Sequence, residues 1–583
     1  MGIVTAEPAL APVSAPELVR ARRARTPARW QLGLLGLAIF LVALAPRWIG
    51  VEQHLTADDQ DWMRRVSRFS QAVRRGDLRG TYQTSHPGLP VLWLTSLAIG
   101  PERSAALAAR AGSLATLEKT PSYLSALFDA RRALGLASAV LTVLLAFLTW
   151  RVFGPGPGLL AGLLLAVEPF LVAHGKLFHT DPLLAQLMAA SGLAALVFFG
   201  GRGGLAYLLG SGLAAGLALL TKAPGIFLFG FVPLLGLAWA GRQAWPPQPP
   251  RIREGWGGRS DIEATVSVTR RLAFRLGLWG LAAGAIYVLL FPAMWVDPLG
   301  TLSRMARAVL GEGETPRTWG NFFLGQATWG DVGPLFYPVA TLLRLSPITL
   351  AGLLLLAWLS LRGRPASWRL PAVALVAYVG LFTLMMTLSP KKIDRYLLPV
   401  YPPLLILGAL GLWLALRRWL VPGARWAVVA ALGLGQAALV AGVHPYPLSF
   451  YNPVLGGIGV ASRALVVGWG EGTDQVAAYL DRQPNAADLV VSSLYHDLLH
   501  AQFRGRGVPL SDWQRADYLA DYVNMDQRGL VPTPLQELVR TAAPVFTARI
   551  NGLDYVRLYE IPAELKAAGG PSGAPRKALP PQR

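Results

Sequence analysis

The segment WQLGLLGLAIFLVALAPRWI, Trp30 to Ile49, is an apolar run long enough to cross the hydrocarbon core of a membrane as a helix. It is preceded by five arginines: Arg20, Arg22, Arg23, Arg25 and Arg29. Because basic residues flanking an apolar segment stay cytoplasmic, we expect residues 1–29 to lie inside. Ala43-Leu44-Ala45 resembles a signal-peptide cleavage site, but Pro46 follows directly and hinders cleavage. We therefore predict a retained helix.

Similar runs, many about 16–22 residues long, recur along the 583-residue chain, of which 53% is hydrophobic. We draw them at 133–150, 157–173, 181–199, 205–221, 225–240, 273–292, 336–361, 371–388, 396–416 and 425–443. The sequence therefore predicts a polytopic α-helical membrane protein with about 11 transmembrane helices spread over residues 30–443.

The charge and the cysteine content argue against several classes of function. With 54 basic and 33 acidic residues the net charge is +21, but the arginines lie between apolar runs, which favours cytoplasmic loops and anionic lipid over nucleic acid. The absence of cysteine excludes disulfides, thiolate catalysis and cysteine-ligated metals.

Because successive spans cross the membrane in opposite directions, each loop can be assigned to one side of the membrane. Arg151, Arg202, residues 241–272, and the pairs Arg362/Arg364 and Arg417/Arg418 fall inside, as the positive-inside rule expects. Residues 52–128 and 293–335 then form extracytoplasmic loops. Everything after residue 443 also lies outside.

The C-terminal part reads as a small extracytoplasmic α/β domain over residues 444–562. DLVVSSLY (488–495) is strand-like, GTDQVAAYLDR (472–482) is helical, and TARINGLDYVRLYEI (547–561) predicts a hairpin with an Asn551-Gly552 turn. Residues 563–583 are rich in Ala, Gly, Pro and Lys, which predicts a disordered tail.

Charged residues also gather at the outer turns. TADDQDW (56–62) carries Asp58, Asp59 and Asp61 just after the first span. The others are His86, Arg131, Arg132, Lys176, His179, Asp181, Lys222, Lys391, Lys392, Asp394 and Arg395. Basic groups at converging helix ends suit a phosphate, and a carboxylate beside them can take a proton from a hydroxyl.

Taken singly, each of these residues has a plainer interpretation. A basic residue at a helix end most often reaches toward lipid headgroups, and a lone histidine is most often a hydrogen-bonded structural residue. Asp61, Arg64, Arg65 and Arg68 fit the wet face of an interfacial helix whose Trp62, Val66 and Phe69 face lipid. Asp59-Gln60-Asp61 is also a DxD motif, so a divalent metal held by Asp59 and Asp61 stays an alternative.

Several stretches resemble the GT-C membrane glycosyltransferases, in the branch of protein O-mannosyltransferases and lipid A aminoarabinose transferase. They are TADDQDW with GDLRGTYQTSHPGLPVLWL, then DARRALGLASAV, KLFHTDPLLAQ, LLTKAPGIFL and KKIDRYLLPVYPPL, in that order. HPYPLSFYNPVLGG and GWGEGTDQVAAYL look like an uncharacterised bacterial subgroup.

The resemblance implies a GT-C fold in the bacterial inner membrane and a polyprenyl-phosphate sugar, mannose or similar, as donor. It implies Asp58 as catalytic base, with Asp59 standing where the family usually has glutamate. It further implies that Asp181, Lys222, Arg131 or Arg132, and Lys391 or Arg395 lie near the donor phosphate. We add His86, His179 and Tyr396 as candidates for binding the donor phosphate or substrate. Direct displacement by an acceptor hydroxyl would invert the anomeric centre, and the basic groups would stabilise the departing phosphate.

Two other functions fit parts of the sequence. A transporter or flippase of lipid-linked sugars would also need outer cations, but it should show inverted halves with broken helices, which the sequence does not display. A membrane scaffold that binds a partner through the outer domain leaves Asp58 without a purpose. The acceptor, whether protein, lipid or glycan, stays open.

Overall fold

A computed structural model of the chain describes residues 29–110, 121–244, 259–314, 319–362 and 367–568. The Arg-rich segment 1–28, part of the loop 241–272 and most of the tail after residue 562 lie outside these ranges. Two compact units divide at Ala38/Ile39, so the beginning of helix α1 (Arg29–Trp48) belongs to one unit and everything from Ile39 onward to the other.

Eight helices in the described residues are long and apolar enough to cross a membrane. They are α1, α6 (Pro121–Phe153), α9 (Asp181–Phe199), α11 (Leu228–Ala244), α12 (Arg259–Leu289), α17 (Arg369–Thr387), α18 (Tyr401–Trp419) and α19 (Pro422–Ala441). Two bent pairs and the shorter α10 (Leu205–Thr221) occupy the remaining predicted spans. Each predicted span thus coincides with a helix or a helix pair, and the polytopic helical fold is confirmed.

The two bent pairs depart from straight spans. Helices α7 (Pro155–Val167) and α8 (Pro169–Gly175) meet at 56°, and α15 (Phe336–Arg344) and α16 (Pro347–Arg362) at 114°. Proline at the start of α8 and of α16 lacks an N–H and disfavours helical geometry in the preceding residue, which accounts for both breaks. The run 336–361, drawn as one span that Arg344 and Pro347 interrupt, is therefore a bent helix pair.

Glu168 joins these two breaks. Its buried carboxylate accepts hydrogen bonds from Ser346 N and Ser346 Oγ, both at 2.9 Å, from Gln436 Nε2 at 2.6 Å and from Thr349 Oγ1 at 3.3 Å. A buried carboxylate is costly unless such donors surround it. Glu168 therefore fixes α8, which carries His174, relative to α15, which carries Arg344.

The helices pack closely where small residues face one another. Helix α10 packs against α9 and α12, and α16 packs against α18. A Cβ at Gly352 would overlap the main chain of Gly408, and one at Gly411 would overlap that of Gly352. Glycine at these positions lets the backbones of α16 and α18 touch, as is common between membrane helices.

Helix α2 (Asp59–Arg75) carries the acidic cluster at its start. It packs against α3 (Leu89–Ile99) and α4 (Pro101–Arg110). Trp62, Val66 and Phe69 are 4%, 0% and 0% exposed, and Phe69 meets Trp93 of α3 edge-on. The expectation that this face contacts lipid is wrong, because neighbouring protein helices cover it.

Short elements complete the loops between the helices. They are η1 (Arg79–Thr81), η3 (Ala223–Phe227), α13 (Ala293–Val296), α14 (Pro298–Glu314), the hairpin of β1 (Asn321–Phe323) and β2 (Gln326–Thr328), η4 (Asp394–Val400), η5 (Pro447–Ser449), η6 (Pro453–Leu455) and α20 (Gly457–Ala464). Several touch across large sequence distances: Leu324 N donates to Ala464 O at 3.0 Å, and Asn321 Nδ2 to Lys392 O at 2.9 Å.

The C-terminal domain is built on a five-stranded sheet in the order β4-β3-β5-β7-β6, with β4, β3 and β5 parallel and β7 and β6 antiparallel. The strands are β3 (Val490–Ser492), β4 (Arg506–Val508), β5 (Tyr518–Tyr522), β6 (Phe546–Ile550) and β7 (Leu553–Glu560). Around them lie α21 (Thr473–Leu480), α22 (His496–Gln502), η7 (Leu510–Arg515), α23 (Val523–Arg528), α24 (Thr533–Thr541) and α25 (Ala563–Ala568).

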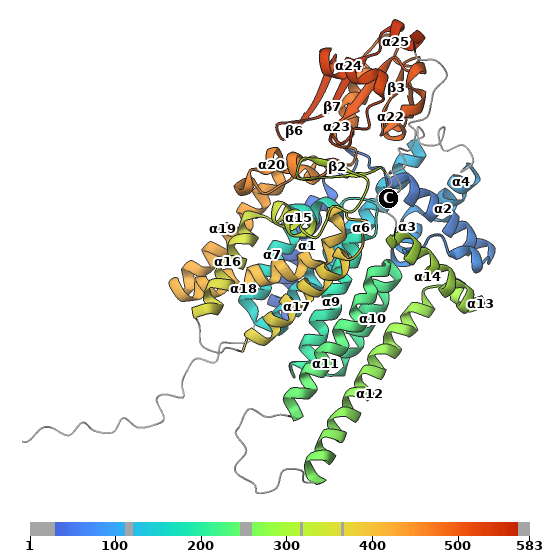
Figure 1. Ribbon diagram of the computed structural model, residues 1–583. Coiled ribbons are helices and arrows are strands. Elements are labelled where there is room, and N and C mark those ends of the chain that lie inside the picture. The colour runs from blue at the N-terminus through green and yellow to red at the C-terminus, as the bar shows by residue number, and fades with distance from the viewer. Residues whose placement is uncertain (1–28, 111–120, 245–258, 315–318, 363–366, 569–583) are drawn as a thin grey trace, which may run out of the picture. The chain divides into compact units, whose positions relative to one another are not determined.

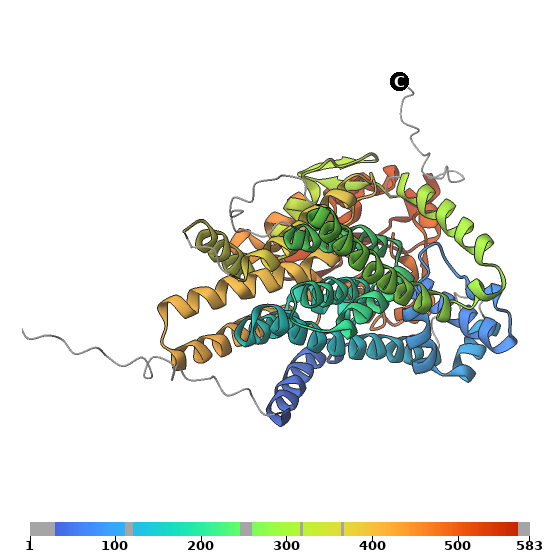
Figure 2. The same ribbon diagram turned by 90° about the horizontal axis from the view of Figure 1, so that it is seen from below.

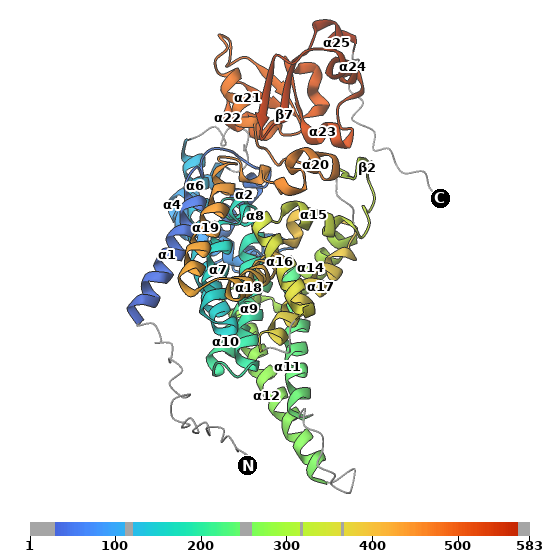
Figure 3. The ribbon, with the colours of Figure 1, turned by 90° about the vertical axis from the view of Figure 1, so that its left-hand side faces the viewer.

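The expected strand at 488–495, helix at 472–482 and β6–β7 hairpin are all present. Asn551 and Gly552 have φ of 53° and 83°, the left-handed backbone that a tight hairpin turn needs. Helix α25 covers residues 563–568, at the beginning of the stretch for which the sequence predicts a disordered tail. Figure 1 shows the sheet beyond one end of the transmembrane helices, and Figure 3 shows the same relation from the side. In Figure 2, seen from below, the helices lie in front of the red C-terminal elements.

Candidate functional site

Asp58 lies in the turn that leads into α2, at the N-cap position of that helix. Its side chain is 33% exposed, and Asp58 Oδ2 is 3.2 Å from Arg395 Nη2. The guanidinium comes from η4, more than 300 residues further along the chain. Asp58 is therefore an accessible carboxylate held by one cation.

Asp59, the next residue, points into the protein. Its side chain is 2% exposed, and Asp59 Oδ2 accepts from Arg131 Nη2 and Thr56 N, both at 2.6 Å. Arg131 also donates to the main-chain oxygens of Val51 and His54, at 2.8 and 2.9 Å. The Asp59–Arg131 pair thus links the loop before α2 to α6. Both side chains are engaged in these buried contacts.

A second cluster surrounds Asp181 at the start of α9. Asp181 Oδ1 is 2.5 Å from Lys222 Nζ, and Asp181 Oδ2 is 3.4 Å from both Arg395 Nε and His179 Nδ1. Lys222 follows α10 directly, and its ammonium lies 4.6 Å from the ring centre of Tyr396. Arg395 therefore bridges Asp58 and Asp181, and four outer turns of the sequence meet at one point.

Two neighbours of Arg395 fix its position. Its guanidinium carbon lies 4.0 Å from the ring centre of Trp469, which precedes α21 of the C-terminal domain. Asp394, the residue before it, accepts from Arg344 Nη2 at 2.8 Å and Nε at 3.0 Å. Arg344 donates in addition to the main-chain oxygens of Leu448 and Phe450. Asp394 and Arg344 thus anchor η4, which carries Arg395.

A cavity of about 440 Å³ opens beside these groups. The transmembrane part contributes Ala57, Asp58, His174, Phe336, Arg344, Ile393, Asp394 and Arg395, and η5 contributes Leu448. Trp319, just before β1, and Asn321, its first residue, also line the cavity. The C-terminal region contributes Leu465, Val466, Gly468, Trp469, Glu471, Leu494, Tyr495, His496, Asp497 and Arg528. The volume is within the usual range for small-molecule sites. The C-terminal domain therefore forms one wall of the cavity and the transmembrane helices the other.

Other residues singled out by the sequence lie away from this point. Arg132 pairs with Glu52 and, at 3.2 Å, with Asp129. Asp61 is 55% exposed and pairs with Arg64. His86 is half-buried in the loop before α3, and Lys391 is half-buried just before η4; neither lines the cavity. Lys392 is buried and binds Asp331 at 2.5 Å.

Glu471 is a cavity residue that the sequence did not single out. It accepts from Trp469 N at 2.5 Å and from the hydroxyl of Tyr522 at 3.1 Å, and burial raises the pKa of its carboxyl group. His174, Arg344 and Trp469 were likewise missed as site residues. The stretches HGKLFHTDP and GWGEGTDQ contain two of them, but no spacing rule predicts contacts between segments so far apart.

The two carboxylates considered for a metal, Asp59 and Asp61, bind Arg131 and Arg64 instead of facing one another. Within the described ranges, no group of three or more His, Asp or Glu side chains is arranged to hold a metal ion.

Comparison with known proteins gives one sequence match. A family model described as dolichyl-phosphate-mannose-protein mannosyltransferase matches residues 125–245. The segment includes DARRALGLASAV, KLFHTDPLLAQ and LLTKAPGIFL, three of the stretches on which the resemblance rests. The similarity to mannosyltransferases is therefore confirmed. No curated protein matches the chain by sequence.

Solved structures also align with most of the chain. ArnT from Cupriavidus metallidurans, bound to undecaprenyl phosphate, gives a TM-score of 0.46 at 15% identity, covering 92% of this chain and 99% of that chain. The oligosaccharyltransferase AglB from Archaeoglobus fulgidus, in complex with an inhibitory peptide and a dolichol-phosphate, gives a TM-score of 0.41 at 12% identity, covering 92% of this chain and 77% of that chain.

Proposed function

We propose that the protein is an inverting glycosyltransferase that moves a sugar, mannose or similar, from a polyprenyl-phosphate donor to a hydroxyl acceptor. The reaction takes place on the extracytoplasmic face of a bacterial inner membrane. The observation that carries this proposal is the bridge of Arg395 between Asp58 and Asp181 at the wall of the cavity. It joins an accessible carboxylate to a cationic centre.

Asp58 is the base in this mechanism. The acceptor hydroxyl approaches the anomeric carbon on the face opposite the lipid phosphate and gives its proton to a carboxylate oxygen of Asp58. The bond from the acceptor oxygen to the anomeric carbon forms as the bond to the phosphate oxygen breaks. The bonding electrons leave with the phosphate, so no general acid is required and the anomeric configuration inverts.

Arg395 and Lys222 stabilise the charge that develops on the departing phosphate. Both are held by Asp181 and both are largely buried, where positioned cations stabilise an anion more strongly than in water. A phosphate that binds Arg395 competes with Asp58 for the same guanidinium. Donor binding therefore frees the Asp58 carboxylate to accept a proton.

The proposed extracytoplasmic position of the reaction rests on the distribution of charged residues along the chain. The cavity gathers loops that the positive-inside rule puts outside, whereas Arg151, Arg202 and the Arg417/Arg418 pair fall at cytoplasmic ends. Trp319, Trp469 and Tyr495 offer apolar ring surface and Glu471 and Asp497 offer acceptors, a mixture suited to a polar acceptor.

Binding of the lipid product tests the donor class. We expect a short-chain polyprenyl phosphate to raise the thermal midpoint of the purified full chain, and a polyprenol without phosphate to leave it unchanged. Arg395→Gln should abolish the shift, whereas Arg540→Gln, at a surface position paired with Glu537, should retain it. If Arg395→Gln is stabilised as strongly as wild type, the phosphate assignment is wrong.

A further inference from the structure

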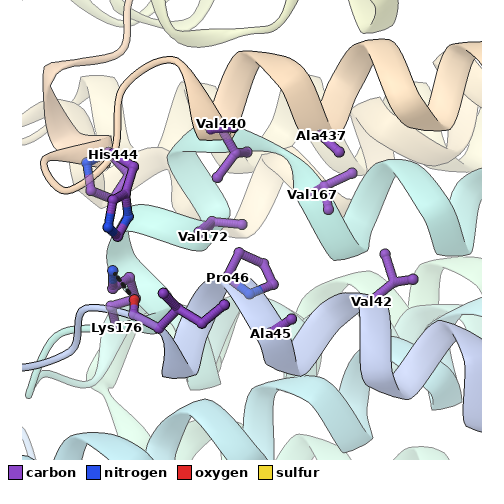
Figure 4. A pocket seen from close by; sticks show the side chains of 12 residues that line it. Val42, Ala45, Pro46, Val167, Val172, Lys176, Ala437, Val440 and His444 are labelled. Atoms are coloured by element: carbon purple, nitrogen blue, oxygen red, sulfur yellow. Dashed lines mark hydrogen bonds between the residues drawn. The ribbon is translucent and has the colours of Figure 1, made fainter.

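A second cavity, of about 490 Å³, lies between α1, the α7–α8 pair and α19 (Figure 4). Ten of its twelve lining residues are apolar, among them Val42, Ala45 and Ile49 of the α1 side and Ala437 and Val440 of α19. Val42 is 39% exposed, and only 17% of the apolar stretch of α19 is buried. The cavity is therefore a groove at the periphery of the helices, open toward the surrounding membrane. We call it the α1–α19 groove.

The two ionisable residues that line the α1–α19 groove, Lys176 and His444, lie at one of its ends. Figure 4 shows Lys176 and His444 together at that end, with Val42 and Ala437 at the other. Lys176 is 2% exposed, and its ammonium donates to the main-chain oxygen of Ile49 at 2.7 Å. Within the described ranges no carboxylate lies within ion-pair distance of it.

The electrostatic surroundings of Lys176 favour an anion. Burial, and secondarily the positive charge of Arg131, lower the pKa of Lys176 to about 8. A buried ammonium without a counter-ion is unfavourable, and an anion placed beside it would relieve that cost. One hydrogen bond to Ile49 leaves two N–H groups of the ammonium for such an anion.

The groove is separate from the reaction cavity. His174 lines the reaction cavity, whereas Lys176, two residues later in the same turn, lines the groove. No residue lines both cavities. The groove and the reaction cavity can therefore hold separate ligands.

We propose that the α1–α19 groove binds one acyl chain of an anionic phospholipid, whose phosphate binds Lys176. The chain lies along α1 and α19, and the headgroup lies at the end where the helices leave the membrane. The apolar lining extends from Val42 and Ala437 at one end to Lys176 at the other, and the groove's volume of about 490 Å³ suits a single apolar chain. This proposal does not depend on the proposed function.

Photo-crosslinking tests it with the full chain in vesicles. The probe is phosphatidylglycerol with a photoreactive group on its acyl chain, present at a low fraction in phosphatidylcholine. We expect crosslinks in peptides containing residues 42–49 and 437–447. Lys176→Met should lower this yield about fivefold, the factor that one lysine contributes near an anionic lipid surface. Lys566→Met, on the C-terminal domain, should not.

Two further measurements separate the groove from ordinary lipid contact. Ala45→Phe fills the groove and should lower the yield, whereas Leu434→Phe, on an exposed face of α19 outside it, should not. A photoreactive phosphatidylcholine, in which choline offsets the phosphate charge, should respond less to Lys176→Met than the anionic probe does. Equal yields for wild type and Lys176→Met with the anionic probe would overturn the proposal. So would displacement of the probe by undecaprenyl phosphate at concentrations where unlabelled phosphatidylglycerol fails to displace it.

Discussion

Asp58 and Asp59 are adjacent carboxylates, and we predict opposite consequences when each is changed to asparagine. Asp59 is 2% exposed and bound at 2.6 Å to Arg131, itself 1% exposed. Removing one charge of a buried pair leaves the other uncompensated and typically costs about 3–5 kcal/mol. Because asparagine still accepts from Thr56 N, we expect the lower end of that range for Asp59→Asn.

Asp58→Asn should cost less than about 1 kcal/mol, since its carboxylate is one-third exposed beside a cavity and its ion pair with Arg395 is partly solvated. The measurement is the free energy of unfolding of the purified full chain in detergent, from denaturant titrations at pH 7. Asp59→Asn should therefore be about 2–3 kcal/mol less stable than Asp58→Asn.

A double-mutant cycle isolates the buried pair. Arg131→Met should be destabilising alone, and its combination with Asp59→Asn should cost less than the sum of the two single changes. Equal stabilities for Asp58→Asn and Asp59→Asn, or strictly additive costs in the cycle, would refute the assignment of Asp59 to the scaffold.

Three further predictions follow from other buried charges. Glu168→Ala leaves several buried donors without an acceptor and should cost at least about 3 kcal/mol in the same unfolding titration; a wild-type stability would contradict this. Burial, and secondarily Asp526, raise the pKa of Asp521 to about 8, so the folded chain holds a proton that the unfolded chain releases near pH 4. Stability should therefore fall as pH rises from 4 to 8, and Asp521→Asn should flatten that slope; an unchanged slope would count against it. Lys222→Met should slow sugar transfer about 100-fold or more while Lys222→Arg retains part of the rate, and a loss below tenfold in a transfer assay would exclude Lys222 from phosphate stabilisation.

The transmembrane architecture could be predicted because it depends on composition over whole segments. Runs of about twenty apolar residues identify helices without tertiary information. The Asn551-Gly552 hairpin was predictable for a local reason, since those two residues tolerate left-handed backbone. Arg344 and Pro347 interrupt the apolar run 336–361 in the sequence, but no local pattern gives the 114° angle between α15 and α16.

The site could be predicted only in part. Basic residues at several outer turns suggested that those turns converge, and the structure brings Asp58, Asp181, Lys222 and Arg395 together. The sequence could not show that Asp59 points into the protein while Asp58 faces the cavity, because neighbouring residues in a turn can direct their side chains to opposite sides. Nor could it place Trp469 on Arg395, since contacts between distant segments leave no local pattern.

The central claim is that Asp58 is the base of a sugar transfer from a lipid phosphate. The most direct measurement is glycan and glycolipid profiling of the cell surface in cells carrying wild type, Asp58→Asn, Asp61→Asn or no gene, at matched expression. Asp61 is the control, because it lies in the same stretch but is 55% exposed and outside the cavity. The account predicts that one sugar-bearing product disappears in the deletion and in Asp58→Asn, while polyprenyl-phosphate sugar accumulates on the outer side, and that Asp61→Asn matches wild type. A wild-type profile in Asp58→Asn, with a changed profile in the deletion alone, would contradict it.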